Sequence, residues 1–561
     1  MFRKRLLLGF GLLAFATVAG PPAAHAATVN PNPFCARIGK TLEASSGAQM
    51  YCFGPQISGT RPHARIVFAP FGANVDAANP SEDVSPAGVQ ADGQSETSIA
   101  AIGPYVVEAW NDATQFISPC PSPGFKEEGT GLGFSANGGV SFVDEGGLPN
   151  VTCKEDKYFG DPSVEAWAPG GSAHFYISSL FDKPSLTGVS FLALSACGAS
   201  GSGTTARLSC GQPVIIAEST QCIVVKGALM CSFLDKDFIA IDPVRGRLYV
   251  AYTEFGFTDS GVIKLAVCDI GTPTGGVGPA GGRASAPVCN PGPHPTTNFK
   301  VAGSVNCENE GAYPAVDLAT GNVYVGWESN WATDFMTPAC FNTPTLNQLA
   351  AVPLKCLPLT GTSPCSAPGK LTAVQVVSTD ATFIPGYNRF PSNDFPRLAV
   401  SDRFRTVSIV WNDAKAHPLG DIYLKSFNLG TLTPVQAVPV RINSLANGGL
   451  HFLPALRNVD ANGNLNISFY QRAVVSTTFT DLVAALNVNP LTASTPPNVR
   501  ETTVASDWLT VSSLIIPNFG DYTDNYVQAS SSPPFTTTRT YAAWSDGRIG
   551  IPQPFETVMK L

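Results

Sequence analysis

The sequence predicts an all-β fold, a single β-propeller, from three observations. First, one pattern recurs seven times: an opening polar or acidic residue, a short apolar strand, a turn, and a second strand that ends in an aromatic residue. Second, the repeats are spaced roughly 57 to 84 residues apart, with opening positions at 96, 161, 235, 310, 394, 451 and 521. Third, four of the seven tryptophans occupy the same place in the repeat: Trp110, Trp327, Trp411 and Trp544. Repeats of a few short strands must stack on their neighbours to bury their apolar faces, and this spacing leaves room for four strands in each.

We expect seven blades of four antiparallel strands. Six is the alternative, because the unit that opens at His451 lacks an acidic opening residue. From Phe519 to the end only three strands can be recognised, at 525–530, 539–545 and 555–561. An isolated strand at 65–71 is available near the start of the chain. Since a propeller leaves no exposed edges when one blade takes strands from both termini, this strand is predicted to complete the last blade.

The chain divides into three predicted parts. Residues 1–26 resemble a secretory signal peptide, with basic residues, an apolar run and small residues before Ala27. A transmembrane helix is the alternative for this run, although it is short for one. Residues 27–60 are a Pro- and Gly-rich lead-in loop, and residues 61–561 are the propeller. Two irregular inserts, 271–300 and 332–370, are expected to be loops on one rim.

All fourteen cysteines follow the predicted signal peptide. An even number of cysteines in an exported chain favours disulfides over metal ligation, and no Cys-x-x-Cys pair is present. Connectivity cannot be derived from one sequence, but near neighbours can close local loops: Cys35 with Cys52, Cys120 with Cys153, Cys197 with Cys210, and Cys222 with Cys231.

The composition limits the partners. Charged residues make up 14% of the chain and the formal net charge is −8, so there is no basic field to attract nucleic acid. After the first 26 residues no segment is long and apolar enough to span a membrane. We therefore expect a secreted monomer, extracellular or in the cell envelope.

One motif makes a family resemblance specific. Residues 133–142 (GFSANGGVSF) match the Asp-box pattern, in which Ser and Asn side chains bond the turn backbone and an aromatic residue packs beneath it. Together with the repeated strands and the late segments 519–522 and 544–548, the chain from about residue 65 resembles exported bacterial sialidase-like proteins with BNR (Asp-box) repeats. The box marks the fold and not a site.

The resemblance implies a catalytic set to look for. Sialidases hold the substrate carboxylate with three arginines and use a tyrosine nucleophile, activated by a glutamate, and an aspartic acid. The early Arg-Ile-Pro signature of the family is absent. The candidates that remain are Tyr522, Asp521, Arg397, Arg472 and Arg548. The alternative is that these arginines pair with neighbouring acids at strand ends.

The opening residues form a second candidate site. The innermost strand of each blade begins near the central channel, so these side chains are expected to point toward one axis. The acidic members are Glu96, Asp161, Asp235 or Asp237, Glu310, Asp394 and Asp521. Such oxygen atoms suit a hard cation, and Ca²⁺ is therefore the one cofactor considered. The alternative is that each carboxylate caps local backbone N–H groups.

Fold alone does not fix function. Our preferred hypothesis is a non-catalytic propeller that binds extracellular glycan or protein, with Trp331 and Tyr387 in the long inserts as rim contacts, because the clear motifs are fold markers. The alternative is a sialidase-like glycoside hydrolase acting on acidic sugars, for which Arg397, Arg472 and Arg548 should converge near Tyr522. A structural cell-envelope protein with neither feature is a third hypothesis. Whether the protein is an enzyme is left open.

Overall fold

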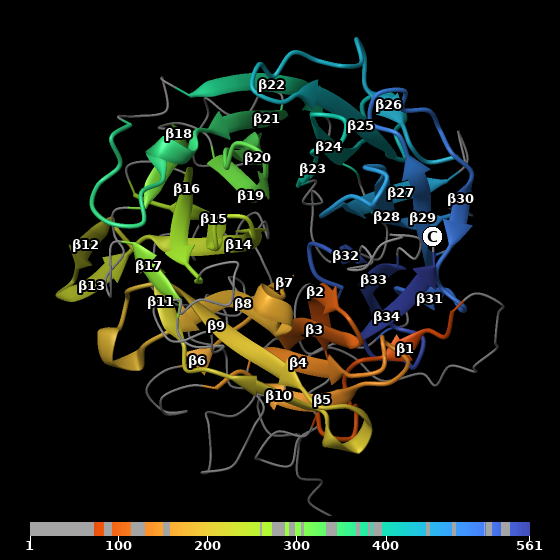
Figure 1. Cartoon of the computed structure of the whole chain (residues 1–561), viewed down its shortest axis with the longest axis horizontal. Helices are drawn as coiled ribbons and strands as arrows, with labels where there is room; N and C mark the ends of the chain where they lie inside the picture. Colours follow the sequence, from red (N-terminus) through yellow and green to blue (C-terminus); the bar gives the residue numbers. More distant parts are fainter. Residues whose placement is uncertain are drawn as a thin grey trace, which may run out of the picture.

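The protein is a ring of seven antiparallel sheets around a central axis (Figure 1). The computed structural model describes residues 72–83, 93–113, 129–149, 157–257, 261–271, 287–290, 298–304, 308–331, 345–365, 371–379, 382, 384, 395–444, 449–473, 478–509, 511, 519–528 and 539–560. The prediction of a seven-bladed β-propeller is confirmed, and the six-bladed alternative is excluded.

In each of the first four blades, the innermost strand comes first in the sequence and lines the centre of the ring. The first blade is β2 (Gln94–Ile102), β3 (Tyr105–Asp112), β4 (Thr130–Ser135) and β5 (Val143–Gly147). The second is β7 (Ser163–Trp167), β8 (Ala173–Asp182) and β9 (Phe191–Ser200), with β6 (Lys157–Tyr158) on β8 and both β10 (Arg207–Cys210) and β11 (Val214–Glu218) on β9. The third is β14 (Phe233–Asp242), β15 (Arg247–Phe255) and β16 (Gly261–Asp269), with β17 (Val288–Asn290) and β18 (Phe299–Ser304) on β16. The fourth is β19 (Glu308–Val316), β20 (Val323–Trp331), β21 (Thr345–Val352) and β22 (Thr372–Thr379).

The fifth and sixth blades repeat this order, and the seventh takes its outermost strand from near the start of the chain. The fifth is β23 (Arg397–Ser401), β24 (Thr406–Asp413), β25 (Asp421–Asn428) and β26 (Val440–Arg441). The sixth is β27 (Leu450–Ala455), β28 (Leu465–Arg472) and β29 (Phe479–Val488), with β30 (Asn498–Arg500) and β31 (Ser506–Asp507) on β29. The seventh is β32 (Asp524–Gln528), β33 (Arg539–Asp546), β34 (Gln553–Lys560) and β1 (Val75–Asp76). Outside the blades lie a peripheral hairpin of β12 (Cys222–Val225) and β13 (Ala228–Cys231) and four 3₁₀ turns, η2 (Pro169–Gly171), η3 (Pro184–Leu186), η4 (Gly203–Thr205) and η5 (Leu354–Cys356).

The ring closes as expected, but with different residues. The three C-terminal strands are present, and the fourth strand of their blade is β1, in which Val75 pairs with Glu556 and Asp76 with Phe555. A further backbone bond joins the amide of Ala77 to the carbonyl of Pro554 at 2.8 Å. The predicted strand at 65–71 lies outside the described residues. A strand of two residues has no periodicity, which is why the sequence does not reveal β1.

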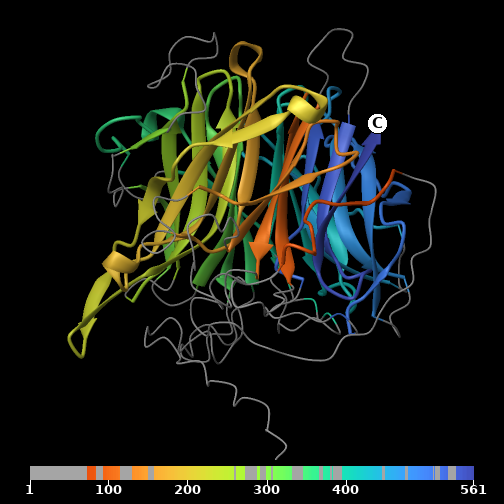
Figure 2. The ribbon, with the colours of Figure 1, turned by 90° about the horizontal axis from the view of Figure 1, so that it is seen from below.

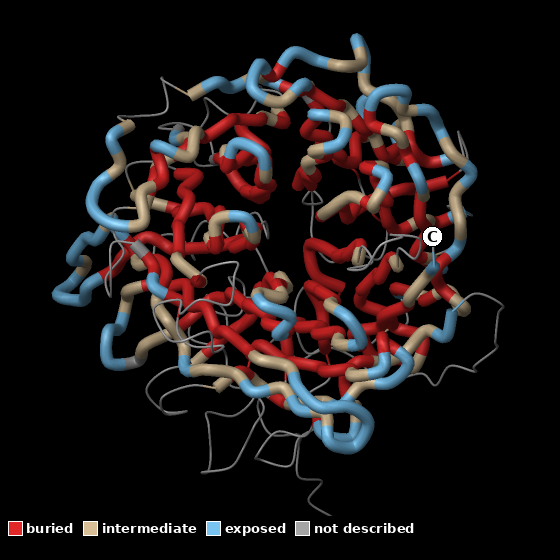
Figure 3. The backbone as a smooth tube through the Cα atoms, viewed as in Figure 1, coloured by how far each residue is buried: buried red, intermediate tan, exposed pale blue. Residues whose placement is uncertain are grey.

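The core lies between the blades. In β24, Val407, Ile409 and Trp411 pack toward the fourth blade, whereas Val410 packs toward the sixth. Alternate side chains are therefore apolar on both faces, because each blade is covered on both sides. Figure 3 shows buried backbone around the inner part of the ring and exposed backbone at its periphery.

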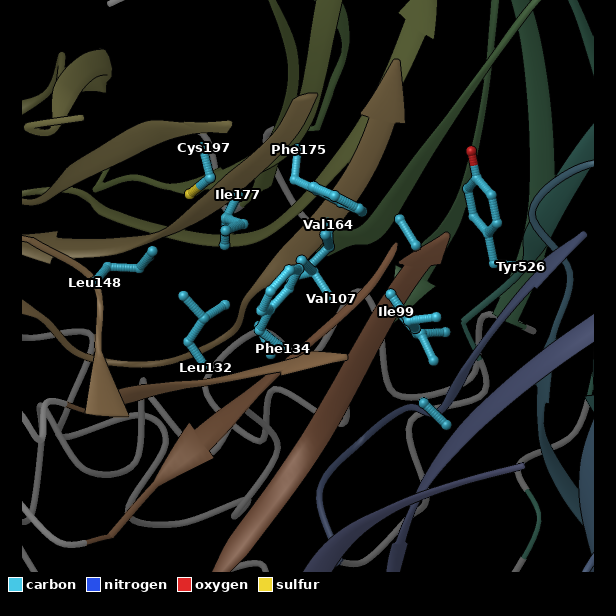
Figure 4. Close-up of a cluster of buried hydrophobic side chains, with 14 of the residues drawn as sticks. Ile99, Val107, Leu132, Phe134, Leu148, Val164, Phe175, Ile177, Cys197 and Tyr526 are labelled. Atoms are coloured by element: carbon cyan, nitrogen blue, oxygen red, sulfur yellow. The ribbon is translucent and has the colours of Figure 1, made fainter. Parts of the chain in front are cut away.

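Figure 4 shows one such inter-blade core, with Val107 and Phe134 of the first blade against Phe175 and Ile177 of the second. Burying a side chain the size of Phe134 contributes about 2 to 3 kcal/mol to the free energy of unfolding.

Four disulfides join described residues. Cys197–Cys210 and Cys222–Cys231 confirm two predicted pairs. Cys268–Cys289 and Cys356–Cys365 add two that the sequence did not single out. The other two predicted pairs fall outside the described residues. Four disulfides are typical of an oxidising compartment.

The insert 332–370 is not only a loop, because it contains β21, the third strand of the fourth blade. The insert 271–300 likewise contains β17 and the start of β18. Among the described residues no helix has the length and hydropathy needed to cross a bilayer. The side view in Figure 2 shows the strands running between the two faces of the ring.

Candidate active site

Four of the seven innermost strands share a backbone irregularity near their starts. The pairing with the second strand shifts register at 95–98, 235–238, 310–313 and 452–455. The residue inside each shift has a left-handed backbone, with φ of 56° at Glu96, 56° at Lys236, 67° at Gly311 and 47° at Leu453. Asp161, which precedes β7, has φ of 55°. Such bulges re-aim side chains, and a left-handed non-glycine residue costs about 1 to 3 kcal/mol, so the surrounding packing must hold it.

Four charged side chains come together near the starts of the innermost strands, two of them, Glu96 and Lys236, at the bulges. The ammonium nitrogen of Lys236 forms an ion pair with Asp521 and lies 3.5 Å from Asp161 Oδ2 and 3.9 Å from Glu96 Oε1. All four side chains have no exposed surface. They come from the first, second, third and seventh blades. We call Lys236, Glu96, Asp161 and Asp521 the lysine cluster.

Asn111, on β3, connects two of the carboxylates. Its amide nitrogen donates to Glu96 Oε2 at 2.9 Å and to Asp161 Oδ1 at 3.3 Å. The two carboxylate oxygens therefore lie no farther apart than these two bonds together allow. The backbone amide of Asp521 also donates to Glu96 Oε1, at 3.1 Å. The orientation of Glu96 is thus fixed by its own blade, through Asn111, and by the seventh blade, through Asp521.

Burial and neighbouring charges shift the pKa values of Lys236 and of the carboxyl groups around it. Burial opposes the charge on Lys236, but the attraction of Asp521, Glu96 and Asp161 outweighs it and raises the lysine pKa. Burial raises the pKa of Asp161 to about 6, with Lys236 acting in the opposite direction. Burial also raises the pKa of the neighbouring Asp237 well above its usual range, while the Ser178 hydroxyl lowers it. Protonated and ionised groups therefore stand next to one another near neutral pH.

An aromatic layer lies beside the cluster. The rings of Tyr313 and Tyr522 pack against Phe238, with centroids 5.0 and 5.2 Å away. The guanidinium of Arg397 lies 4.4 Å from the Phe238 centroid and 5.6 Å from the Tyr522 centroid. Lys236 lies 5.3 Å from the Tyr522 centroid. This layer therefore connects Arg397 to the lysine cluster through cation–π contacts.

Tyr522 has the surroundings of a neutral phenol. Its hydroxyl donates to the carbonyl oxygen of Pro162 at 3.3 Å. Burial raises its pKa well above the ordinary value, and the negative charges of Asp161 and Glu96 add to this. A tyrosine nucleophile needs a base that removes its proton, and these surroundings favour keeping it.

The other two candidate arginines have separate partners. Arg472, on β28, donates to Thr480 at 2.8 Å and packs on the Trp508 ring, whose centroid is 5.2 Å away. Arg548, beyond β33, forms an ion pair of 2.6 Å with Asp546. Arg397 is on an innermost strand, whereas Arg472 is on a second strand and Arg548 lies in the turn that follows one. The contacts therefore place Arg397 beside Tyr522, and they place Arg472 and Arg548 with other partners. The three arginines do not converge near Tyr522 as predicted.

The remaining predicted residues divide in two. Asp235 and Glu310 are buried on their innermost strands, and their role as ligands stays a prediction. Asp394 and Tyr387 lie outside the described residues, and so does the side chain of Trp331. Their roles stay predictions.

Three of the carboxylates in the predicted ring surround the ammonium group of Lys236. Among the described residues no group of three or more His, Cys, Asp or Glu is arranged to hold a metal ion. The ammonium of Lys236 stands among the carboxylates where Ca²⁺ was considered. Calcium binding stays a prediction for the chain as a whole.

Sequence reasoning missed Lys236 and Asn111. Lys236 stands between Asp235 and Asp237, the two residues proposed as alternative openers, and only the backbone shift shows that the lysine occupies the bulge. Asn111 follows Trp110 in the repeat, and the same Trp-Asn pair recurs at Trp411. The recurrence of this Trp-Asn pair was the feature of the sequence that could have identified Asn111.

The comparisons with known proteins concern the fold. No protein-family model and no curated protein matches the chain. Among solved structures, an α-L-arabinofuranosidase from Fusarium graminearum is 10% identical, with 88% of this chain and 98% of that chain covered and a TM-score of 0.40. A Hadza microbial sialidase is 9% identical, with coverage of 87% and 68% and a TM-score of 0.38. The Trypanosoma rangeli sialidase is 10% identical, with coverage of 89% and 60% and a TM-score of 0.34.

These comparisons correct one prediction. We preferred a non-catalytic binding propeller, but the three solved structures named above are an α-L-arabinofuranosidase and two sialidases, which are enzymes, and the preference was wrong. It rested on the absence of recognisable catalytic motifs, which is weak ground because catalytic groups are assembled from separate blades. At these identities the likeness concerns the fold, so the case for catalysis depends on the site itself.

Proposed function

We propose that the protein is a glycoside hydrolase whose acid and nucleophile are Asp161 and Glu96 of the lysine cluster. The observation that carries the proposal is the pair of carboxylates joined by Asn111, of which Asp161 has a pKa raised to about 6, with the Lys236 ammonium 3.5 Å from Asp161 and 3.9 Å from Glu96. Two neighbouring carboxyl groups with different proton affinities are the requirement for glycosidic bond cleavage.

The reaction assigned to this pair has two steps. Asp161 gives its proton to the glycosidic oxygen while the Glu96 carboxylate attacks the anomeric carbon, so the bond to the leaving alcohol breaks and a glycosyl ester forms. Asp161, now ionised, removes a proton from water, which attacks the same carbon and releases the sugar and Glu96. Lys236 and Asn111 position the carboxylates. The spacing allowed by the two Asn111 bonds is below the roughly 6.5 to 9.5 Å of inverting enzymes, which supports retention of configuration.

The charge of the cluster favours a neutral sugar. Three carboxylates face one ammonium, so an anionic sugar meets repulsion, and the two outer arginines lie elsewhere. The acidic-sugar alternative is kept as a second arm of the test. Because the four side chains have no exposed surface, binding of a sugar requires a rearrangement around them.

The test is hydrolysis of 4-methylumbelliferyl glycosides by the full chain, with a panel of neutral furanosides and pyranosides and a sialic acid glycoside. We expect turnover on a neutral member, with kcat falling as pH rises above about 6 because Asp161 loses its proton. Asp161→Asn and Glu96→Gln should each lower kcat by about 10²- to 10⁴-fold. NMR of the first product should show the retained anomer.

Two controls separate the alternatives. Glu501→Gln, which alters a buried carboxyl outside the cluster, should keep full turnover. Tyr522→Phe should also keep most of it, whereas its complete loss would return the nucleophile to Tyr522. Absence of turnover on the whole panel, with a folded protein, would reject the proposal.

Two finer assignments belong to the same proposal. The 135–141 turn between β4 and β5 is proposed as an Asp-box, since Ser135 Oγ accepts from the Gly139 amide at 3.0 Å and Asn137 Oδ1 from the Ser141 amide at 3.0 Å.

The disulfides support export to an oxidising compartment, and mass spectrometry of the mature N-terminus tests cleavage before Ala27.

A further inference from the structure

The peripheral hairpin of β12 and β13 projects outward from the ring (Figure 1, Figure 2). In sequence it lies between β11 of the second blade and β14 of the third, and it forms a two-stranded sheet of its own. Its turn is the pair Lys226–Gly227, both left-handed, with φ of 50° and 85°. Such a two-residue turn fits the natural twist of a hairpin. The disulfide Cys222–Cys231 closes the base, so the hairpin is held in one shape.

The base of the hairpin is tied to the third blade. Glu254, on β15, accepts a hydrogen bond from the Thr220 amide at 2.6 Å and another from the Ser232 hydroxyl. Thr220 precedes β12 and Ser232 follows β13, so one buried carboxylate holds both ends of the hairpin. Lys264 forms an ion pair with the same carboxylate. A surface that is rigid before binding loses less entropy when it meets a partner.

The hairpin exposes apolar side chains on both faces. Its eight strand residues, 222–225 and 228–231, include no charged, amide or hydroxyl side chain. Val224 and Leu229 pair across the strands and are 70% and 46% exposed on one face, and Ile223 is 39% exposed on the other. Exposed strand edges in proteins are usually protected by a charge, a proline or a bulge. The strand β12 carries none of these.

One edge of the hairpin is covered and the other is open. The Cys231 amide donates to the Gly188 carbonyl at 2.7 Å, and the Leu229 carbonyl oxygen lies so close to Gly188 that a Cβ has no room there. These backbone groups of β13 therefore point away from β12. Because opposite residues alternate between bonded and non-bonded pairs, the partners Cys222 and Val224 also point their N–H and C=O groups outward. Those groups have no hydrogen-bond partner in the described part of the chain.

We propose that the open edge of β12 pairs with the same edge of a second copy of this chain, about a two-fold axis. The two hairpins then form one four-stranded antiparallel sheet. Val224 exchanges backbone hydrogen bonds with the partner's Cys222, and Cys222 exchanges them with the partner's Val224. The side chain of Ile223 meets the partner's Ile223 at the axis, as a non-hydrogen-bonded pair.

A second copy suits this edge for two reasons. The edge is complementary to itself, because apolar side chains face apolar side chains and no like charges are opposed. The covered edge of β13 leaves nothing for a third copy to extend, so the assembly stops at two. A bilayer suits it less, because hydrocarbon offers no partner to the open backbone groups. The pairing does not depend on the protein being a hydrolase, and the monomer expected from the sequence is the alternative outcome of the test.

The test is sedimentation velocity of the full chain, with its disulfides intact, from about 1 to about 200 µM. We expect a monomer–dimer equilibrium with a Kd on the order of 10 µM, because the paired surface is small. Ile223→Lys places two like charges opposite each other at the axis and should weaken dimerisation at least about tenfold, and Ile223→Glu should do the same. An equimolar mixture of the two variants should dimerise again, because Lys then faces Glu across the axis.

The matched control is Val438→Lys, at another exposed apolar position, which should dimerise as the wild type does. If the Ile223 variants do not fold, Val224→Lys, at a more exposed position of the same edge, takes their place and should weaken dimerisation. Wild type that stays monomeric at about 200 µM would overturn the proposal. A mixture of folded Ile223→Lys and Ile223→Glu that stays monomeric, or undiminished dimerisation of Val224→Lys, would overturn it too.

Discussion

Glu501 is a buried carboxyl group whose effect on the free energy of unfolding can be worked out from its pKa. Its Oε1 accepts from Ser468 Oγ at 3.2 Å, and Oε2 has no hydrogen-bond partner among the described residues. Burial raises its pKa from 4.5 to about 8, with the Ser468 bond acting against the rise. Folded Glu501 therefore keeps a proton that the unfolded chain has released.

The sign and size of the effect follow directly. Because the folded pKa is the higher one, the contribution of Glu501 to the free energy of unfolding is fully present below about pH 4.5 and is lost as the pH rises toward 8. Each pH unit in that window costs about 1.4 kcal/mol, so the loss at pH 7 is about 3 kcal/mol. Glu501→Gln keeps the shape and the bond from Ser468 but does not titrate.

The assay is urea denaturation of wild type and Glu501→Gln at pH 4.5, 6, 7 and 8. The unfolding free energy of the variant minus that of the wild type should rise by about 3 kcal/mol between pH 4.5 and 7. Taking the difference removes the contributions of other buried acids. Glu82→Gln, at an exposed carboxylate, should show no such rise. Parallel curves for wild type and Glu501→Gln would refute the reasoning.

Two further predictions concern the start of the channel. Lys236→Met leaves the carboxylates of the lysine cluster without their cation and should lower the unfolding free energy by about 3 to 5 kcal/mol. Millimolar CaCl₂ should raise the Tm of this variant but not that of the wild type. Equal calcium responses of the two proteins would contradict the role given to the lysine. Gly311→Ala places a Cβ against the Phe395 ring at φ of 67° and should cost more than 2 kcal/mol by denaturation, whereas Gly103→Ala, at φ of 60° with open space, should cost about 1 kcal/mol or less. Equal losses for the two glycine variants would show that crowding by Phe395 is not the cause.

The fold was predictable because apolar and aromatic residues define the repeat. Trp110, Trp327, Trp411 and Trp544 all fall on the second strands of their blades, where both faces are buried. The site was less predictable, because its geometry depends on a single-residue backbone shift. At the bulge the residues are Glu96, Lys236, Gly311 and Leu453, which share a φ angle and no chemistry. A pattern of acidic openers therefore located the right strand ends but missed the lysine that holds them together.

The separation of the candidate arginines has a similar cause. One arginine in each of three blades looked equivalent in the sequence, yet Arg397 is on a first strand and Arg472 is on a second. Depth within a blade is set by strand order, and the spacing between repeats does not encode it. Only the three-dimensional register distinguishes a channel residue from one that braces a neighbouring strand.

The pairing of β1 with β34 has a consequence for biosynthesis. The first described strand pairs with residues 555–556, so the ring cannot close before β34 has been synthesised. Loop-closure entropy makes such a distant contact slow to form, and the open edge of the seventh blade is exposed until it does. A chain that ends before β34 has nothing for β1 to pair with. Closure of the ring therefore requires both segments in one chain, and a truncation that removes β34 is expected to leave the seventh blade open and its edge exposed.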